Sequence, residues 1–548
     1  HGTYGIQAAA RDFFSVDARD LNLEQCALLV GVLPSPARFS PKAHPDRAFR
    51  RRNLVMAAML EHGYVEEYDY ERLRYKPIDV HRTDAIPGFA PYFTEHVRRQ
   101  MEMEDERLGI NLYRDGLEIH TTLDSRMQSI ATRIFQEEIN NNQRVLNESL
   151  MQNDTLIYRV IDTLIYPIDS VRAMIDGDIA IPEELKDKLL VQGAFVLLEN
   201  DTGNILAMIG GRTDFPDYWN RATQAKRQPG STFKPLLYMT AIDQGYPVST
   251  QLLNQPLPQT GDAILNGADT SFYDPRNDDG STSGLVTLRH ALRHSLNIVS
   301  ARMVIQLVTP TQVVDMAKRF HITTPLRAVR SIALGTSEVY VLELTAAYAA
   351  LANNGVWVEP LAVTRIMDRR GKALREFIPE RKEVIEAEKA YIMLDLMRGV
   401  VDLGTGARVR WMFGFNRPAA GKTGTTDDWN DAWFVGFTPQ LTAGVWVGVD
   451  DPRVSLGEER FGNVAALPIW ARIMKEVHQS FDMPVLSWQM PADLVRLDIC
   501  KVTKDRPTKY CPREKEIFIR GTEPPDACQV HTGFESQPYN PDDDVFLN

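Results

Sequence analysis

The segment Arg227-Gln228-Pro229-Gly230-Ser231-Thr232-Phe233-Lys234-Pro235 carries the most informative pattern in this chain. Ser231 and Lys234 stand three positions apart, so on a helix their side chains share one face, about one turn apart. That spacing lets a lysine amine take the proton of a serine hydroxyl, which converts a weak nucleophile into an effective one. Gly230 permits a sharp turn before the serine, and the N–H groups at the start of the helix point toward it. Taken alone, the serine is equally well explained as a helix N-cap.

Lys234 must be neutral to accept a proton. An ordinary lysine has a pKa of about 10.4, and lowering it to near 7 costs the charged form about 4 kcal/mol. Burial and a second nearby cation both lower a lysine pKa. We hypothesise that this cation is Lys422 of Lys422-Thr423-Gly424. The alternative is a charge that protects a strand edge from aggregation.

Two further patterns supply polar groups for a bound substrate. Ser295 of Ser295-Leu296-Asn297 offers a hydroxyl that passes a proton from Lys234 to a leaving amine, and Asn297 offers an amide suited to gripping a peptide backbone. The alternative for both is a local cap or turn. Thr423 and Thr425 offer hydroxyls beside the Lys422 cation, which suits a carboxylate. Gly424 is expected to leave room for a substrate strand, and the neighbouring His294 is not chosen as a base.

Length and composition bound the class of protein. A chain of 548 residues exceeds one hydrophobic core, so two to four domains are expected. A net charge of −12 argues against a general nucleic-acid role. No apolar run is long enough to span a bilayer. The first residue is His1 rather than Met, so a membrane anchor upstream stays open as an expectation.

Three of the four cysteines, Cys500, Cys511 and Cys528, cluster near the C-terminus with His531 close behind. In an oxidising compartment two of them would form a disulfide. Three cysteines and one histidine are also the ligand count of a tetrahedral zinc site. Because the spacings are looser than those of zinc modules, a disulfide or free thiols are favoured over zinc.

Hydrophobic patterning predicts an α+β fold, with antiparallel strand pairs at both ends of the main domain and helices between them. The predicted hairpins join residues 194–199 to 204–209 and residues 433–437 to 441–449. The predicted helices include one capped by Asn22, one over 46–60, one capped by Asp124 or Ser125, and one over 232–244. Residues 76–125 are predicted to be a linker that becomes a strand at 117–122, and residues 140–190 an insertion or a helical connector.

The motifs and their order resemble those of the penicilloyl serine transferases. The segments Asn220-Arg221-Ala222, 227–235, 421–426 and 431–436 look like the transpeptidase domain of class A, bifunctional penicillin-binding proteins. Thr121-Thr122-Leu123-Asp124 resembles the linker of that class. Gly2-Thr3-Tyr4-Gly5-Ile6-Gln7-Ala8-Ala9-Ala10 and Leu33-Pro34-Ser35-Pro36 resemble the C-terminal part of its peptidoglycan glycosyltransferase domain.

The resemblance implies a role for each site residue. Ser231 attacks the D-Ala-D-Ala bond of a peptidoglycan stem peptide, Lys234 is its base, and Ser295 relays the proton to the leaving D-Ala. Asn297 orients the donor stem, and Lys422, Thr423 and Thr425 hold its carboxylate. The backbone N–H groups of Ser231 and Thr425 form the oxyanion hole. A second stem then attacks the acyl-enzyme, and β-lactams acylate Ser231 instead of the donor.

The resemblance also implies an organisation and a location. The expected domains are a glycosyltransferase remnant at 1–75, a linker with an insertion at 76–190, the transpeptidase at 191–485 and a small cysteine-bearing module with a disordered tail at 486–548. Transpeptidation needs no cofactor, whereas the intact glycosyltransferase would use a divalent metal and lipid II. The expected location is the periplasmic side of a bacterial inner membrane, reached through an upstream anchor, with wall-synthesis proteins as partners.

One departure and three rival functions remain open. The two glutamate motifs of the family's glycosyltransferase are not in this sequence, so this chain by itself is expected not to polymerise lipid II. A β-lactamase shares the motifs but hydrolyses its acyl-enzyme rapidly. A D,D-carboxypeptidase passes the acyl group to water, and a penicillin sensor uses acylation only as a signal.

Overall fold

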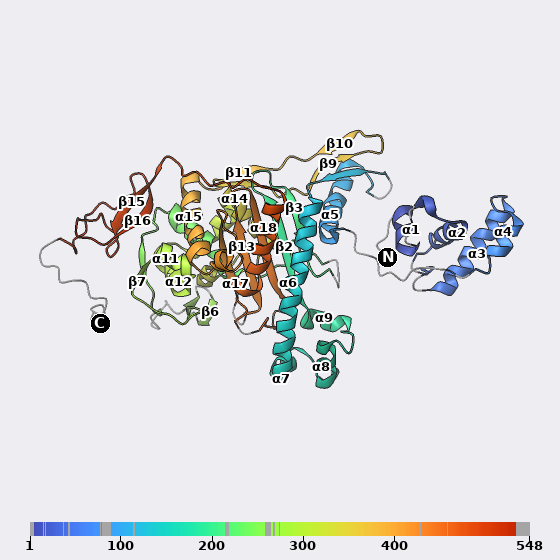
Figure 1. Cartoon of the computed structure of the whole chain (residues 1–548), viewed down its shortest axis with the longest axis horizontal. Coiled ribbons are helices and arrows are strands. Elements are labelled where there is room, and N and C mark those ends of the chain that lie inside the picture. The colour runs from blue at the N-terminus through green and yellow to red at the C-terminus, as the bar shows by residue number, and fades with distance from the viewer. Residues whose placement is uncertain are drawn as a thin grey trace. The chain divides into compact units, whose positions relative to one another are not determined.

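The computed structural model describes every residue except 1–4, 15, 17, 37, 42–43, 77, 79–88, 113–114, 214–218, 258–264, 267–268, 273, 427–428, 458 and 533–548. The chain forms two compact units (Figure 1). The first comprises residues 1–91, 100–118 and 367–374, and the second comprises 92–99, 119–366 and 375–548. Gly2, Thr3 and Tyr4 of the N-terminal motif and the predicted disordered tail lie outside the described residues, the tail from residue 533 onward.

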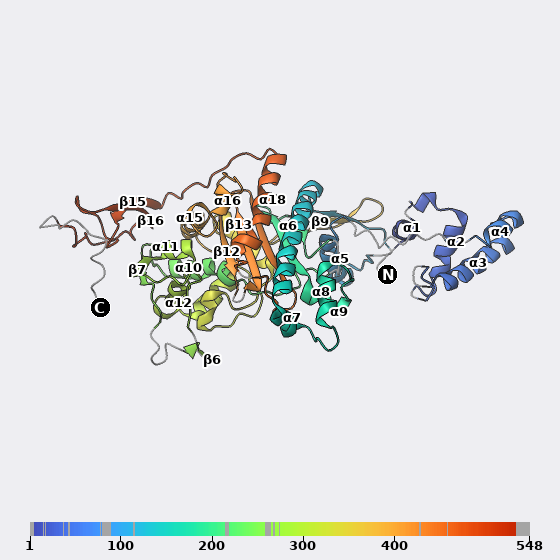
Figure 2. The same ribbon diagram turned by 60° about the horizontal axis from the view of Figure 1, so that its bottom comes forward.

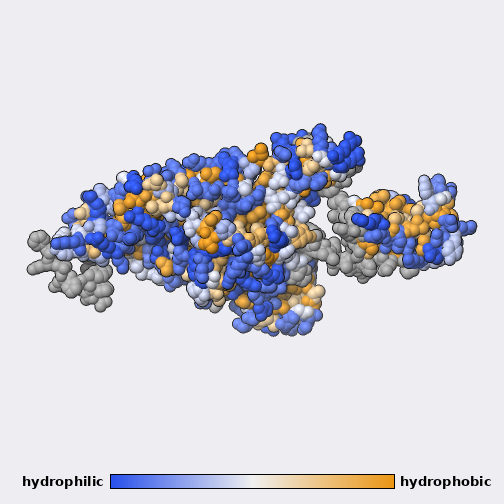
Figure 3. Space-filling view, turned by 45° about the horizontal axis from the view of Figure 1, so that its top comes forward, coloured by the Kyte–Doolittle hydropathy of each residue, from blue (hydrophilic) through white to orange (hydrophobic). Residues whose placement is uncertain are grey.

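The first unit is helical, as the sequence predicts for residues 1–75. Its elements are α1 (Ile6–Phe14), a 3₁₀ turn (Ala18–Asp20), α2 (Leu23–Val32), α3 (Pro45–Glu61), α4 (Glu67–Leu73) and part of α5 (Pro91–Leu108), whose residues 92–99 belong to the second unit. Asn22 caps α2 through a reciprocal capping box with Gln25, which confirms the predicted cap. Hydrophobic residues gather on the face of these helices drawn in Figure 3, and exposed ones include Leu33 and Leu54.

Strand β1 (Glu118–Thr121) confirms the strand predicted at 117–122, whereas helix α5 corrects the prediction that the residues before it are only a linker. Pro91 stands at the first position of α5, where a missing N–H costs nothing. Phe93, Val97 and Met101 recur at four-residue spacing and are buried, which gives the helix an apolar face. Glu95 adds ion pairs with Arg98 and Arg99 on the next turn. None of the described helices is long and apolar enough to span a bilayer.

The second unit is built on a five-stranded antiparallel sheet in the order β12-β13-β14-β2-β3, which confirms the predicted α+β fold. Its strands are β2 (Val191–Glu199), β3 (Ile205–Ile209), β12 (Ala420–Thr425), β13 (Asp431–Phe437) and β14 (Leu441–Val449). Both predicted hairpins are present, and pairing of β14 with β2 joins them into one sheet. Every residue of β13 and β14 is buried, because helices cover both faces of the sheet.

Helices α6 (Ser125–Gln152) and α18 (Leu467–Ser480) pack side by side on one face of the sheet, and α14 (Val341–Ala352) packs on the other (Figures 1 and 2). Asp124 caps α6 by accepting hydrogen bonds from Arg126 N and Met127 N, as predicted. Glycines permit the close approach, since a Cβ at Gly193 would lie 3.0 Å from Phe135 of α6. Residues 140–190 prove to be a helical connector, formed by the end of α6 with α7 (Asp154–Val160), α8 (Ile168–Asp176) and α9 (Glu183–Leu189).

Strand β12 carries the Lys422 motif, and a helical region that extends beside it carries the Ser231 and Ser295 motifs. Its elements are the 3₁₀ turn η2 (Gly230–Phe233), α10 (Lys234–Asp243), α11 (Leu288–His294), α12 (Asn297–Gln306), α13 (Pro310–Arg319), the 3₁₀ turn η4 (Arg330–Leu334), α15 (Ala387–Leu403), α16 (Arg408–Trp411) and α17 (Gly462–Ala465). Short strands complete the fold, namely β1 (Glu118–Thr121), β4 (Gln251–Leu253), β5 (Leu265–Asn266), β6 (Asp269–Phe272), β7 (Leu285–Thr287), β8 (Val356–Val358), β9 (Val363–Met367), β10 (Ala373–Glu376), β11 (Arg381–Glu383), β15 (Leu494–Cys500) and β16 (Arg513–Ile519).

Candidate active site

Ser231 lies in the 3₁₀ turn η2, directly before α10, rather than one residue before an α-helix that starts at Thr232. In a 3₁₀ turn, side chains three positions apart are eclipsed, so Ser231 and Lys234 still lie on one side. Gly230 has a φ of 53°, and a Cβ there would come within 2.3 Å of the Thr425 carbonyl oxygen. The sharp turn predicted at this glycine is confirmed, and close packing against β12 also requires it.

Two buried aromatic side chains hydrogen-bond to the backbone of the Ser231 turn from the core side. The Tyr348 hydroxyl donates a hydrogen bond to the Thr232 carbonyl oxygen at 2.6 Å, and the Trp433 indole N–H donates to the Gln228 carbonyl oxygen at 2.8 Å. Both rings are buried in the core, one on α14 and the other on β13. The turn is therefore fixed before any substrate arrives, which is how a site reduces the entropy cost of reaction.

Lys234 is fully buried, and its amine is anchored by the Ser295 motif. Nζ donates hydrogen bonds to the Ser295 carbonyl oxygen and to Asn297 Oδ1, both at 2.7 Å, and lies 3.3 Å from Ser295 Oγ. Burial lowers the pKa of Lys234 to about 7, although the charge of Asp278 opposes the shift. Among the described residues, the Ser231 hydroxyl makes no hydrogen bond to Lys234, so the predicted contact is not formed in this state.

Ser295 stands between two lysine amines. Its hydroxyl lies 2.9 Å from Lys422 Nζ and 3.3 Å from Lys234 Nζ. Its backbone has a φ of 58°, where it ends α11 in the left-handed conformation that favours glycine. A non-glycine residue held in this region commonly marks a functional site.

Lys422 is as deeply buried as Lys234, which excludes the alternative of a surface charge at a strand edge. Burial lowers the pKa of Lys422 well below its ordinary value, and the positive charge of Lys234 adds to that shift, while Asp278 opposes it. The second amine expected from sequence is thus near, but it is burial that lowers the pKa of Lys234, whereas the charge of Lys234 adds to the burial that lowers the pKa of Lys422. His294, in contrast, is exposed, and its ring is tilted by 40° to that of His290 with the ring centroids 4.4 Å apart.

Asn297 is held by groups that sequence reasoning missed. Its Nδ2 donates to Asp278 Oδ1 at 2.8 Å and to the Arg276 carbonyl oxygen at 2.9 Å. Because both partners are acceptors, they fix the orientation of the amide and turn Oδ1 toward Lys234. Asp278 lies in a polar turn nearly 20 residues before Asn297. No local sequence pattern predicts a contact between residues that far apart in the chain.

The β12 segment forms the opposite side of the site. Thr425 lines the pocket, and its hydroxyl accepts a hydrogen bond from Gly462 N at 3.0 Å. Thr423 is not among the residues that line the pocket, and its hydroxyl lies 2.7 Å from the Thr405 hydroxyl and 3.5 Å from Lys422 Nζ. The expectation for Gly424 needs correction, because a Cβ there would lie 2.5 Å from the Pro229 carbonyl oxygen. The missing side chain makes room for the Ser231 turn rather than for a substrate strand.

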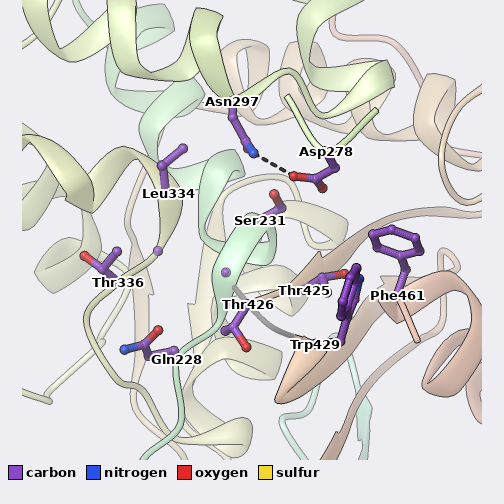
Figure 4. A pocket seen from close by; sticks show the side chains of 12 residues that line it. Gln228, Ser231, Asp278, Asn297, Leu334, Thr336, Thr425, Thr426, Trp429 and Phe461 are labelled. Carbon is purple, nitrogen blue, oxygen red and sulfur yellow. Dashed lines mark hydrogen bonds between the residues drawn. The ribbon is translucent and has the colours of Figure 1, made fainter. Parts of the chain in front are cut away.

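A pocket of about 200 Å³ opens above Ser231. Figure 4 shows Ser231 between Asn297 and Asp278 on one side and Thr425 with Trp429 on the other. The lining residues are Gln228, Gly230, Ser231, Asp278, Asn297, Leu334, Gly335, Thr336, Thr425, Thr426, Trp429 and Phe461. The lining does not include Lys234, Ser295, Lys422 or Thr423, although Lys234 donates a hydrogen bond to the lining residue Asn297. The arrangement supports acyl transfer to a serine, with two buried amines available for proton movement.

Comparison with known proteins agrees with this architecture. The family model for the penicillin binding protein transpeptidase domain matches residues 193–475, the transglycosylase model matches 1–60, and the model for the penicillin-binding protein 1A C-terminal domain matches 490–533. The chain is 32% identical to penicillin-binding protein 1A of Aquifex aeolicus, over 96% of this chain and 76% of the relative. It is 31% identical to penicillin-binding protein 1A of Neisseria lactamica, over 86% of this chain and 66% of the relative, just under two thirds of that protein's length.

Solved structures share the fold. The crystal structure of penicillin-binding protein 1A from Haemophilus influenzae aligns with a TM-score of 0.72 at 24% identity, covering 96% of this chain and 90% of that one. The structure of the penicillin-binding protein PonA1 from Mycobacterium tuberculosis aligns with a TM-score of 0.54 at 22% identity, covering 73% and 94%. The chain belongs to the class A penicillin-binding proteins, serine-type enzymes of peptidoglycan synthesis. Acyl transfer by their transpeptidase domain needs no cofactor.

Proposed function

We propose that this chain cross-links peptidoglycan stem peptides through an acyl-enzyme on Ser231. The observation that supports this most strongly is the convergence of two buried amines, Lys234 and Lys422, on the Ser295 hydroxyl beside the pocket that Ser231 lines. A serine that only caps a helix would not require two lysine amines to be buried beside it, and such burial is costly.

Lys234 is the base in this proposal. A neutral amine has two N–H groups and one lone pair, and the two acceptors at 2.7 Å, the Ser295 carbonyl and Asn297 Oδ1, engage both N–H groups. The lone pair is then left to accept a proton. The missing bond to Ser231 is no objection, because catalytic hydrogen bonds often tighten only when substrate is bound.

The reaction proceeds in two transfers. Ser231 Oγ attacks the carbonyl carbon of the D-Ala-D-Ala bond, and its proton passes to Lys234. The C–N bond breaks, and Ser295 relays the proton from Lys234 to the leaving D-Ala amine. An amine of a second stem then attacks the ester carbonyl, and its proton returns to Ser231 Oγ by the same route.

Other residues bind the donor stem. Asn297 orients its backbone, and Lys422, Thr423 and Thr425 attract its terminal carboxylate, with Thr425 the member of this group that lines the pocket. The N–H groups of Ser231 and Thr425 are the proposed oxyanion hole. Removing one such donor typically costs about 10²–10³ in rate.

The wider assignments belong to the same proposal. The domains are a glycosyltransferase part at 1–75, a linker region at 76–190, the transpeptidase at 191–485 and a C-terminal module at 486–548. The whole protein would polymerise lipid II with a divalent metal and cross-link the product at the outer face of the cytoplasmic membrane, together with other wall-synthesis proteins. β-Lactams would acylate Ser231.

Incubation with stem pentapeptides tests the proposal, with product masses as the readout. A cross-linked dimer that lacks one D-Ala supports transpeptidation, whereas trimmed monomers alone indicate a carboxypeptidase. Ser231→Ala is expected to abolish the dimer, while Ser129→Ala, an exposed serine of α6, is the matched control. Dimer formation by Ser231→Ala would contradict the assignment of the nucleophile.

A further inference from the structure

The C-terminal module is a small unit with little hydrophobic core. Between residues 490 and 532 its regular structure is one antiparallel pair, β15 with β16. An isolated two-stranded hairpin is marginally stable at best in water. Chains of about 40 residues usually need a disulfide, a metal or a partner to stay folded. Something beyond apolar burial must therefore hold this module together.

Three cysteines and a histidine converge at one end of the hairpin. Cys500 ends β15, Cys511 precedes β16, and Cys528 and His531 lie in the segment that follows. An isolated β-bridge pairs the backbone of Arg506 with that of Ala527, so this segment lies beside the loop between the two strands. The four ligand-type atoms all lie within 4.8 Å of one another, and the three cysteines are buried.

The interatomic distances fit a shared metal ion. With Zn–S bonds of about 2.3 Å and a Zn–N bond of about 2.0 Å, tetrahedral geometry separates each sulfur from the nitrogen by about 3.5 Å. His531 Nδ1 lies 3.5 Å from Cys500 Sγ and 3.3 Å from Cys528 Sγ. Cys528 and His531 are separated by only two residues, a spacing close enough for two ligands of one ion.

Thr508 contacts one of the sulfur atoms. Thr508 N donates to Cys511 Sγ at 3.2 Å, and the Thr508 hydroxyl lies 3.4 Å from the same atom. The backbone N–H is a donor that stabilises a thiolate and orients it, while the Thr508 hydroxyl donates to the His531 carbonyl oxygen and so links two of the ligand residues. A disulfide would engage two of the three sulfurs and leave the third with an unused histidine, and the structure holds all three as free thiols.

We propose that Cys500, Cys511, Cys528 and His531 form a structural zinc site that closes the C-terminal module. Three thiolates and one imidazole fill the four positions of a tetrahedral zinc ion, so no position remains for a substrate. Binding releases the three thiol protons to solvent. This reverses the preference for a disulfide or free thiols that the spacings alone suggested, because the fold brings distant cysteines together.

The site has a structural consequence for the transpeptidase. Glu516 of β16 is buried and accepts hydrogen bonds from Arg289 of α11, with Nε to Oε2 at 2.8 Å. Arg289 also pairs with Asp395 of α15 at 2.8 Å, and Arg496 of β15 pairs with the same carboxylate. Helix α11 ends at Ser295. The zinc site therefore fixes the hairpin that braces the helix leading into the active site.

Metal analysis of the whole chain tests the zinc site. The protein is purified under reducing conditions, loaded with zinc sulfate, passed through a desalting column and measured by plasma mass spectrometry. We expect about one zinc ion per chain in the wild type, and a loss of most of it in Cys511→Ser and Cys528→Ser. The matched control is Cys26→Ser, which removes the fourth cysteine, in α2, and should keep the full content.

A second measurement uses only the wild-type protein, so its result does not depend on whether the variants fold. Replacement of zinc by Co²⁺ should give the visible absorption of a tetrahedral ion bound by thiolates. Wild-type protein that holds well under one zinc after loading, or Co²⁺ without that absorption, would overturn the proposal. A disulfide among Cys500, Cys511 and Cys528 in protein isolated from its native compartment, found by non-reducing peptide mapping, would overturn it as well.

Discussion

Lys234 and Lys422 both contact the Ser295 hydroxyl. The proposed mechanism depends on their burial, because burial lowers the pKa of each amine. The prediction from sequence that Lys234 needs a lowered pKa agrees with the burial that places it at about 7. Lys422 was expected to be near, and its amine lies 2.9 Å from Ser295 Oγ. The single residue that sequence reasoning missed most clearly is Asp278, whose charge opposes both shifts.

The acylation rate should follow the deprotonation of Lys234. Because only the neutral amine accepts a proton, acylation by a penicillin is expected to fall about tenfold per pH unit below about 7 and to level off above it. Lys234→Arg should abolish this acylation, since an arginine does not deprotonate in proteins. Stopped-flow acylation across pH measures this, with the exposed Lys226→Arg as control. A rate that is flat from about pH 5 to 8 would rule out Lys234 as the base.

Two substitutions at Ser295 can separate the effect of losing its hydroxyl from the effect of its strained left-handed backbone. Ser295→Gly and Ser295→Ala both remove the hydroxyl, and both should slow acylation to a similar extent. Only glycine relieves the φ of 58°, so the Gly variant should be more stable than the Ala variant by about 1 kcal/mol. Urea unfolding and acylation assays on the two variants check this. Different acylation rates would show that backbone geometry, not the hydroxyl, controls the step.

At the scale of elements, the sequence predicted strands and caps well where local chemistry decides them. Asn22 and Asp124 cap helices as expected, and both hairpins pair as expected. The pairing of β14 with β2 could not be predicted, because no local signal links strands more than 200 residues apart. Helix α5 was missed although Phe93, Val97 and Met101 form a buried stripe at helical spacing, a signal that the sequence contains.

The contact of β16 with α11 is a testable link between elements. Burial by itself would lower the pKa of Arg289. The ion pairs with Glu516 and Asp395 outweigh this effect, so the pKa is raised overall. Glu516→Gln should cost about 2 kcal/mol of stability, less than the roughly 3–5 kcal/mol for breaking a buried pair, because Asp395 remains. Glu514→Gln, on the same strand but paired with Lys504 near the surface, should cost under about 1 kcal/mol. Equal losses in urea unfolding would contradict the bracing role of Glu516.

At the scale of the whole molecule, the family was predictable because three separate motifs occur in one order. The spatial arrangement of residues around the motifs was not predictable, and the structure changed the interpretation of Gly424 and of the C-terminal cysteines. Gly424 serves packing against the Ser231 turn, and the three distant cysteines meet at His531. Both depend on approaches between segments far apart in sequence, which only the folded chain reveals.

Burial of Lys234 should also make the stability of the molecule depend on pH. Its folded pKa of about 7 lies below the unfolded value, so between the two values the unfolded state binds a proton that the native state does not. The free energy of unfolding should therefore rise with pH across that interval. In Lys234→Met the rise should be smaller, as measured by urea unfolding at about pH 7.5 and about pH 9. An identical rise in both proteins would show that Lys234 is protonated in the native state.

The central claim is that Ser231 is the nucleophile of a penicillin-sensitive acyl transferase. The most direct measurement is mass spectrometry of the intact chain and its peptides after brief treatment with benzylpenicillin. The account predicts one long-lived covalent adduct per chain, located on the peptide that carries Ser231 and absent from Ser231→Ala. An adduct on another residue, or rapid return to the unmodified mass as in a β-lactamase, would contradict it.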